Sequence, residues 1–439
     1  MGVISRRRGF AAVAVVAAAA LVAAGCSKSD TASGDKKITL TVTVYGEFGY
    51  ETAKAGLYDK YMQTHPNITI KEIGEGQQLG DENTKLDQTL AAGAGAGDIV
   101  ALEEGTITKY KGLAQDFVDL NNYGGAALKD NFLPWKFQEG TTSDGKLLGL
   151  GTDVGSMGIC YRTDMFAAAG LPTDRTAVGN LWPTWQAYLD QGVKFAGSPE
   201  GSKAKWVDAA TNLYNNILMQ VAGANTGYTY FDKSNNLVLS SNPDIKTAYD
   251  MTTKAISQGL SAGEISFSDE WTAGFKNSKF ATIACPAWML ANIQENSGDG
   301  LSGKWDIAKA PGDGGNWGGS FLSVTKQSKH PAEAADLVKF LTSPESQLAV
   351  FEKLGNLPSS PKDYDDPTFQ AFKNPYFSNA PTGQIFGAGA EALKPVYLGA
   401  KNNDVRTAVE ATLQAVEQKK KTPDQAWQLA LSSGAAAAK

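Results

Sequence analysis

Carboxylate and aromatic side chains stand directly after segments that this sequence predicts to be β-strands. Glu47 and Phe48 follow the first predicted strand, and Asp153 follows the apolar run LLGLG. Glu103 and Glu104 follow the buried strand that DIVAL predicts; being adjacent, they point opposite ways, and we assign Glu104 to the ligand. In open parallel sheets, ligands bind beyond the carboxyl ends of the strands. These positions therefore predict a binding site.

Three tryptophans lie where a flat ring could face a ligand. Trp317 stands in the glycine-rich loop GDGGNWGGS, Trp288 follows the strand-like run ATIAC, and Trp271 lies at a predicted helix start. The chain has nine tryptophans, which is more than core filling alone suggests. The tryptophans assigned to the core are Trp182, Trp185 and Trp427, and those weighed mainly as core residues are Trp135, Trp206 and Trp305.

The combination of rings and carboxylates fits a sugar. A pyranose presents apolar C–H faces, which indole rings match with little side-chain freedom to lose. Its hydroxyl rim donates hydrogen bonds that carboxylates accept, as in a cleft with few, well-placed polar groups. A glycosidase would also need a pair of carboxylates, but no spacing in this sequence singles out an acid and a nucleophile.

The elements that must position these residues alternate between strands and helices. Alternating apolar residues predict a strand over 38–44, a helix follows over 51–64, and NITIKE predicts a second strand. The stretch AAGAGAG connects a helix to the DIVAL strand. Helices are expected over about 183–260 and 403–433, with GAAAAK frayed at the end, and Ser343-Pro344 predicts a helix start. This rhythm predicts an α/β fold with a mostly parallel sheet and helices on both faces.

Composition excludes several classes of function. The chain has 439 residues, 42% of them apolar, and a net charge of −6, so a packed acidic protein is expected and nucleic acid is not an expected partner. The two histidines, His65 and His330, lie far apart and predict no metal site. Nucleophile-elbow, zinc-protease and phosphate-loop motifs are absent from the sequence. Cys160 and Cys285 are either two buried thiols or one bridge.

Cys26 ends an export signal. Arg6 to Arg8 precede the apolar run 10–24, which is shorter than the roughly 20 residues that span a membrane. The sequence AAGC resembles a bacterial lipoprotein signal, although Ala23 replaces the usual Leu or Val. A plain secretory signal with an incidental cysteine is the alternative. The segment RRGF also resembles a twin-arginine signal, while general secretion stays open. The expected mature chain begins at a lipid-modified Cys26 with a polar tether over 27–36.

Several segments, in order, resemble family 1 extracellular solute-binding proteins, the sugar receptors of ABC importers. They are DIVALEEG, LGLGTDVGSMGICYRTDMFAAAGLPTD, LWPTWQAYLDQGVKFA, FKNSKFATIACPAW and GGSFLSVTKQSKHPAEAADLVKFLTSPESQ. GTDVGSMGICYRTDMF is especially similar to actinomycete cello-oligosaccharide receptors. The resemblance implies a two-lobed periplasmic-binding-protein fold with three hinge crossovers. Lobe one would cover 37–152 and 311–342, and lobe two 153–310 and 343–439.

The resemblance also implies the activity. Sugar, in the first instance a cello-oligosaccharide, would bind between the lobes and pass to ABC transporter permease subunits. The implied protein is a monomeric receptor on the outer face of the cell membrane, with no catalysis, cofactor or metal. The ligand residues are then Glu47, Phe48, Glu104, Asp153, Trp271, Trp288 and Trp317, with Phe386 and Tyr397 as weaker candidates. The alternatives are a lipid-anchored glycoside hydrolase and a receptor for an anion or peptide, although Arg162 and Arg175 are scattered along the chain.

Overall fold

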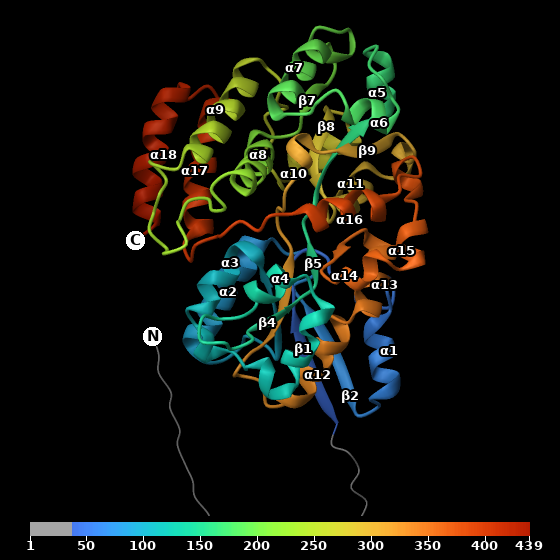
Figure 1. Cartoon of the computed structure of the whole chain (residues 1–439), viewed down its shortest axis with the longest axis vertical. Helices are drawn as coiled ribbons and strands as arrows, with labels where there is room; N and C mark the ends of the chain where they lie inside the picture. The colour runs from blue at the N-terminus through green and yellow to red at the C-terminus, as the bar shows by residue number, and fades with distance from the viewer. Residues whose placement is uncertain (1–36) are drawn as a thin grey trace, which may run out of the picture. The chain divides into compact units, whose positions relative to one another are not determined.

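The protein, as a computed structural model, is described over residues 37–439. Its framework is two β-sheets, each covered by helices, in the lower and upper parts of Figure 1. We call the half with the five-stranded sheet the first lobe and the half with the four-stranded sheet the second lobe. Cys26 and its export signal lie outside the described residues. Among residues 37–439, no helix combines the length and the apolarity needed to cross a membrane.

The first lobe is built on a sheet with the strand order β2-β1-β3-β10-β4. Its strands are β1 Ile38–Thr43, β2 Ile68–Ile73, β3 Ile99–Glu103, β4 Gly149–Gly151 and β10 Ser320–Val324. Its helices are α1 Leu57–Thr64, α2 Leu79–Ala92, α3 Glu104–Lys111, α4 Pro134–Glu139 and α12 Pro331–Leu341. The predicted stripe of α12, from Ala334 to Leu341, packs against strands β1 and β10 in one buried cluster.

The second lobe is built on a sheet with the strand order β7-β8-β6-β9. Its strands are β6 Met157–Arg162, β7 Lys205–Val207, β8 Phe280–Pro286 and β9 Trp305–Lys309. Its helices are α5 Thr163–Ala168, α6 Arg175–Gly179, α7 Trp185–Ala196, α8 Ala210–Ala224, α9 Pro243–Ser257, α10 Asp269–Lys276 and α11 Met289–Ser297. Trp182, Trp185 and Trp206 are buried in its core.

The chain crosses between the lobes after β4 and again after β9. The first crossing contains β5 Asp153–Val154, which pairs with β11 Leu357–Pro358. The C-terminal helices are α13 Pro344–Leu354, α14 Pro361–Tyr364, α15 Pro367–Ala371, α16 Thr382–Ala392, α17 Asn402–Glu417 and α18 Pro423–Ala437. In Figure 1, α17 and α18 stand beside α9 in the upper half, whereas α13 lies near α1.

Two sequence predictions about these elements are wrong. The mostly parallel sheet is found only for β2-β1-β3 and β7-β8; β10 runs antiparallel to β3 and β4, and β6 antiparallel to β8 and β9. Strands β6, β9 and β10 adjoin the lobe crossings, so no helical crossover fixes their direction as it does in βαβ units. The C-terminal GAAAAK is also not frayed throughout, because α18 extends to Ala437. Thr422 caps this helix with a capping box.

Cys160 and Cys285 form a disulfide, which decides the alternative left open by the sequence. The bridge joins antiparallel neighbours β6 and β8, and both residues are fully buried. It closes a loop of 125 residues. A cross-link of this span restricts the unfolded chain and, by loop entropy alone, contributes up to about 5 kcal/mol to the stability of the second lobe.

Candidate functional site

The loop that carries Trp317 crosses from β9 to β10 and is pinned to the other crossing by backbone hydrogen bonds. The amide of Trp317 donates to the carbonyl of Gly155 over 2.9 Å. A β-carbon on Gly155 would lie 1.9 Å from the carbonyl oxygen of Trp317, so only glycine permits this approach. The glycine-rich sequence GDGGNWGGS therefore lets the backbone at Trp317 pack closely against the other crossing, which fixes the position of its indole ring between the lobes.

Trp317 belongs to a row of aromatic rings. The indole nitrogen of Trp288 donates to the carbonyl oxygen of Trp317 over 2.9 Å, and the two ring centroids lie 5.6 Å apart. Phe267 continues the row with its ring 6.3 Å from Trp288 and inclined by only 26°. The structure thus brings the two predicted residues Trp288 and Trp317 together, and both stay partly exposed.

Phe267 is a member of the row that sequence reasoning missed. Its side chain is 37% exposed, and its backbone has a φ of 68°, a left-handed conformation that bulky residues rarely adopt. Strain of this kind persists where the surroundings impose it, often at ligand sites. The only sequence signal was an apolar residue isolated among polar ones in ISFSDE, which also describes an ordinary surface residue.

Trp271 lies behind this row and not on its surface. Its side chain is 1% exposed, and its indole nitrogen donates to the carboxylate of Asp208 over 2.7 Å. Burial raises the pKa of Asp208 to about 6, an effect that the hydrogen bond from Trp271 opposes. Trp271 packs 5.0 Å from Phe267, so in this structure it supports the exposed ring, and its contact with a ligand stays a prediction.

A cavity adjoins Trp317, with walls from both lobes. Residues Glu103 and Gly105 line it from the first lobe, and the second lobe contributes residues of α8, of α17, of the segment after α8 and of the segment before α17. The second-lobe lining residues are Asn215, Leu218, Met219, Thr229, Tyr230, Leu398, Asn402 and Arg406. The lining mixes apolar surface with a few polar groups, as small-molecule sites do, but the cavity volume of about 20 Å³ has room for little more than a water molecule in this arrangement of the lobes.

The polar groups of this cavity are organised by hydrogen bonds. The amide of Asn215 donates to Glu410 over 2.6 Å, and Arg406 lies 3.7 Å from the same carboxylate. Thr229 donates to the amide oxygen of Asn402 over 2.8 Å. Sequence reasoning missed these residues because they are ordinary polar positions on helices and, for Thr229, in a loop, and only the fold shows that they lie around a common space.

The adjacent glutamates are separated as predicted, but the one that reaches the cavity is Glu103. Its carboxylate caps α3 by accepting from the amide of Gly105 over 2.8 Å. Glu104 is 3% exposed and pairs instead with Lys136 over 3.3 Å and accepts from Asn316 over 2.6 Å. Burial raises the pKa of Glu104 to about 7, while the ammonium of Lys136 opposes the rise.

Asp153 lies in the first crossing and holds it to the second. Its carboxylate accepts from the hydroxyl of Thr152 over 2.7 Å and from the amide of Ser320 over 2.9 Å. Burial raises its pKa, and Lys136 again opposes the rise. In this structure Asp153 links the two crossings through its hydrogen bond with Ser320. Contact between Asp153 and a ligand stays a prediction.

Glu47 and Phe48 lie in the loop after β1, next to Tyr45, whose hydroxyl is 2.6 Å from the hydroxyl of Ser320. Phe48 is buried between Tyr45 and Tyr50, whose ring centroids are 5.5 and 5.8 Å away. Glu47 forms an ion pair with Lys54. Among the aromatic pairs of residues 37–439, none joins Phe48 to Phe267, Trp288 or Trp317.

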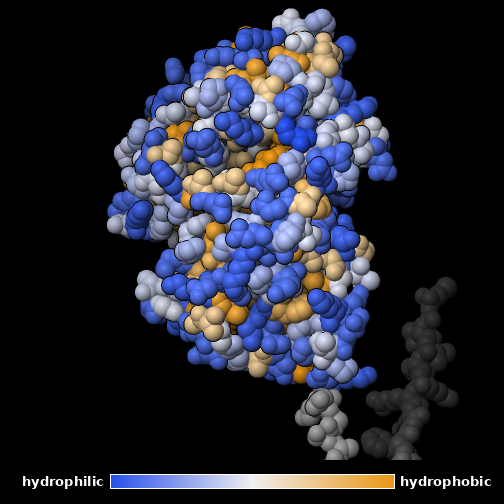
Figure 2. All heavy atoms as spheres, turned by 45° about the vertical axis from the view of Figure 1, so that its right-hand side comes forward, coloured by the Kyte–Doolittle hydropathy of each residue, from blue (hydrophilic) through white to orange (hydrophobic). Residues whose placement is uncertain are grey.

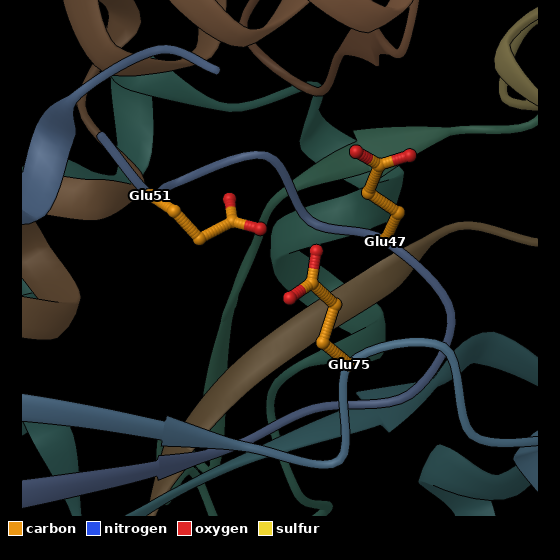
Figure 3. A group of neighbouring side chains, drawn as sticks. All are labelled: Glu47, Glu51 and Glu75. Carbon is orange, nitrogen blue, oxygen red and sulfur yellow. The ribbon is translucent and has the colours of Figure 1, made fainter. Parts of the chain in front are cut away.

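The carboxyl groups of Glu47, Glu51 and Glu75 point toward one another, as Figure 3 shows. They each offer an oxygen within 4.8 Å of the others, which is a spacing that a hard cation can use. The hydrogen bond with Glu51 is the main reason that the pKa of Glu75 rises to about 7. Shared protons and Lys54 therefore account for this cluster without a metal.

The remaining aromatic candidates are structural in this conformation. Phe386 is fully buried, and Tyr397 packs against the second-lobe core. Trp427 packs 4.9 Å from Tyr249, in agreement with its assignment to the core. On the face seen in Figure 2, hydrophilic side chains dominate and apolar ones gather in small groups, including one in the hollow of the upper half.

Comparison with known proteins gives consistent matches over nearly the whole described chain. Residues 56–379 match the family described as "Bacterial extracellular solute-binding protein". A crystal structure titled "Extracellular solute-binding protein family 1" is 38% identical, with a TM-score of 0.79, and the match covers 92% of this chain and all of that one. The arabinooligosaccharide-binding protein of Bacillus subtilis is 27% identical over 92% of this chain and 94% of its own. The lactose-binding protein of Rhizobium radiobacter is 24% identical over 82% of this chain and 83% of its own.

Proposed function

Because this chain belongs to the bacterial extracellular solute-binding proteins of family 1, we propose that it captures an oligosaccharide outside the cytoplasm and delivers it to an ABC importer. The observation that carries the proposal is the aromatic row of Phe267, Trp288 and Trp317 beside a cavity with walls from both lobes. Two relatives named for oligosaccharide or lactose binding support the same ligand class.

The chemistry of the row suits successive pyranose units. Each ring offers a flat apolar face to the C–H groups of one sugar, at little cost in side-chain freedom. The carboxylate of Glu103 and the amides of Asn215 and Asn402 offer acceptors and donors for the hydroxyl rim. A ligand that contacts both lobes binds the closed arrangement more tightly than the open one and therefore shifts the protein toward the closed form.

We place the lobe boundaries at 37–152 with 311–342 and at 153–310 with 343–439. Strands β1–β4 and β10 share one sheet and β6–β9 share the other, which supports the first two crossings. At the third crossing, Val350 and Leu354 of α13 pack in the first-lobe core, while Phe351 packs with residues of the second lobe. We infer that α13 lies at the boundary and turns with the hinge.

The ligand that we propose is a cello-oligosaccharide, on the resemblance of GTDVGSMGICYRTDMF to receptors for those sugars. Isothermal titration of the purified protein with cellotriose, arabinotriose, lactose and maltotriose tests the class and ranks the linkages. We expect binding of at least one sugar at micromolar Kd or tighter, with cellotriose first. Absence of heat for all four would overturn the sugar proposal. Tightest binding of a sugar other than cellotriose would change only the linkage that we propose.

A specific observation keeps a second ligand class in the test. Arg406 lines the cavity, and its Nε has no hydrogen-bond partner among the described residues, so an anionic group could pair with it. Glu410 already faces this guanidinium, which weakens that alternative. Arg162 and Arg175 are committed to Asp164 and Asp306. Glycerol 3-phosphate therefore serves as the anionic probe beside the sugars, and product analysis of incubated cellotriose tests for hydrolysis.

We further propose that Cys26 carries a lipid that keeps the receptor at the outer face of the membrane, near its permease and as a monomer. The support is the sequence AAGC at the end of the export signal. Expression of the full chain and of Cys26→Ser should place the first with membranes and release the second into the soluble fraction. Equal distribution of both would contradict the anchor and leave the binding proposal untouched.

A further inference from the structure

Asn316 links the aromatic platform to a deeply buried charge pair. This residue directly precedes Trp317, and both ends of its amide are used. Its nitrogen donates to a carboxylate oxygen of Glu104 over 2.6 Å, and its oxygen accepts from the amide of Gly155 over 2.8 Å. One side chain therefore ties the Trp317 loop to the first lobe and to the other crossing.

Glu104 is a firm anchor for this link. It is the first residue of α3, and its backbone amide donates to the carbonyl of Gly319 over 2.9 Å. Its second carboxylate oxygen lies 3.3 Å from Lys136, which is 0% exposed and sits 4.1 Å above the ring of Phe321. The carboxylate is held on the side away from solvent, so a ligand has no direct access to it.

The peptide units around Trp317 are therefore held from three directions. Glu104 holds the preceding residue through Asn316, Gly155 holds the amide of Trp317, and Trp288 holds its carbonyl oxygen. The first contact comes from the first lobe, and the last comes from the second lobe. Further backbone bonds, from Gly155 to Gly318 and from Glu104 to Gly319, hold the residues that follow, so the loss of one contact is expected to tilt the indole ring without unfolding the loop.

We propose that Glu104 and Asn316 are positioning residues that set ligand affinity through the orientation of Trp317, without touching the ligand. This inference rests on the proposed sugar-binding function. It changes the role predicted for Glu104 from a direct acceptor of sugar hydroxyls to a support of the ring that stacks on the sugar. A buried, fully used polar network of this kind specifies one geometry for the groups that it holds.

A double-mutant cycle on ligand affinity tests the inference, with cellotriose or the tightest sugar of the panel as the probe. Asn316→Ala alone is expected to weaken binding about tenfold, a coupling of ordinary size for residues in contact. In a Trp317→Ala background, the same substitution should change affinity less than about twofold, because the group through which it acts is gone. Additive losses would overturn the inference and indicate direct or general structural roles.

Exchanging the carboxylate of Glu104 and the amide of Asn316 between the two positions tests whether their hydrogen bond, and with it the ligand affinity, can be restored. Asn316→Asp alone sets two carboxylates against each other and should weaken binding at least as much as Asn316→Ala. Combined with Glu104→Gln, the new glutamine amide can donate to the new aspartate, the Gly155 amide keeps its acceptor, and the pair keeps a single negative charge, now at residue 316. Affinity within about threefold of the wild type is expected for the double variant. Failure to recover, in a protein that folds, contradicts the inference.

Matched controls separate this inference from the proposed function. Asn374 is also a buried asparagine, but it caps a short helical turn by accepting from the amide of Tyr376, away from the aromatic row. Asn374→Ala should lower the melting temperature without changing affinity. If the wild type binds no sugar, the proposed function fails; if it binds sugar and the losses add, only the positioning role fails.

Discussion

Replacing Trp317 with alanine is expected to weaken oligosaccharide binding about 30-fold, the largest loss of any truncation in the aromatic row. The ring combines partial exposure with a backbone that is held from both lobes, so it meets the ligand at small cost in ordering. Central aromatic anchors in such settings contribute about 2 kcal/mol or more when truncated. Isothermal titration of the variant with cellotriose, or with the tightest sugar of the panel, measures the loss.

Truncations of the neighbouring aromatic residues are expected to have smaller effects on affinity than the loss of Trp317. Phe267→Ala should cost about fivefold, because its exposed ring offers one face and lies at the end of the row. Trp271→Ala removes a buried ring, so it should destabilise the fold by about 3 kcal/mol or more and affect binding only through Phe267. Trp427→Ala is the control far from the row and should leave affinity unchanged. Unchanged affinity for Trp317→Ala would assign that ring to structure.

The fold was predictable where periodicity and turn chemistry act locally. Alternating residues located β1 at Ile38–Thr43. Ser343 does cap α13, with Pro344 at the first position, and glycine ends α2 as AAGAGAG suggested. The directions of β6 and β10 were not predictable in this way, because they depend on where a crossing chain re-enters a sheet. No local pattern records that choice.

The site was predictable in kind but only partly in detail. Trp317 and Trp288 could be singled out because glycines and a strand end leave little for their rings to fill, and the structure places them side by side. Trp271, unlike those two, lies on a helix, and the sequence does not show which face of that helix is buried. Its burial follows from the hydrogen bond to Asp208, which only the structure shows. Adjacent glutamates at a strand end present opposite faces, and the sequence could not tell which one meets Lys136.

Lys136→Met is expected to destabilise the protein by about 4 kcal/mol at pH 8.5, the largest stability effect that we predict. The ammonium is fully buried and faces Glu104. Glu139 on the same helix is partly buried, and burial of its carboxyl group raises its pKa well above the ordinary value. Removing one partner of a buried ion pair leaves the other charge uncompensated, which typically costs about 3–5 kcal/mol. Urea denaturation followed by circular dichroism measures the loss.

The loss should grow with pH, and its sign follows from the pKa of Glu104. Burial already raises that pKa to about 7, so the protonated carboxyl favours the folded state, and this contribution is lost as pH rises from the unfolded value through 7. Without Lys136 the folded pKa of Glu104 rises further, so in the variant this carboxyl continues to lower the stability above pH 7, where in the wild type its contribution is already lost. We therefore expect a clearly smaller difference at pH 6 than at pH 8.5.

Two companion variants isolate the charge from the packing. Lys109→Met removes the ammonium of a half-exposed pair with Asp87 and should cost less than about 1 kcal/mol at either pH. Adding Glu104→Gln to Lys136→Met removes the unpaired carboxylate at position 104 and should recover much of the stability at pH 8.5, because neutral groups need no counter-charge. A loss that is equal at both pH values, or that the second substitution does not reduce, would mean that Lys136 stabilises the first lobe through its packing against Phe321 instead of through its charge.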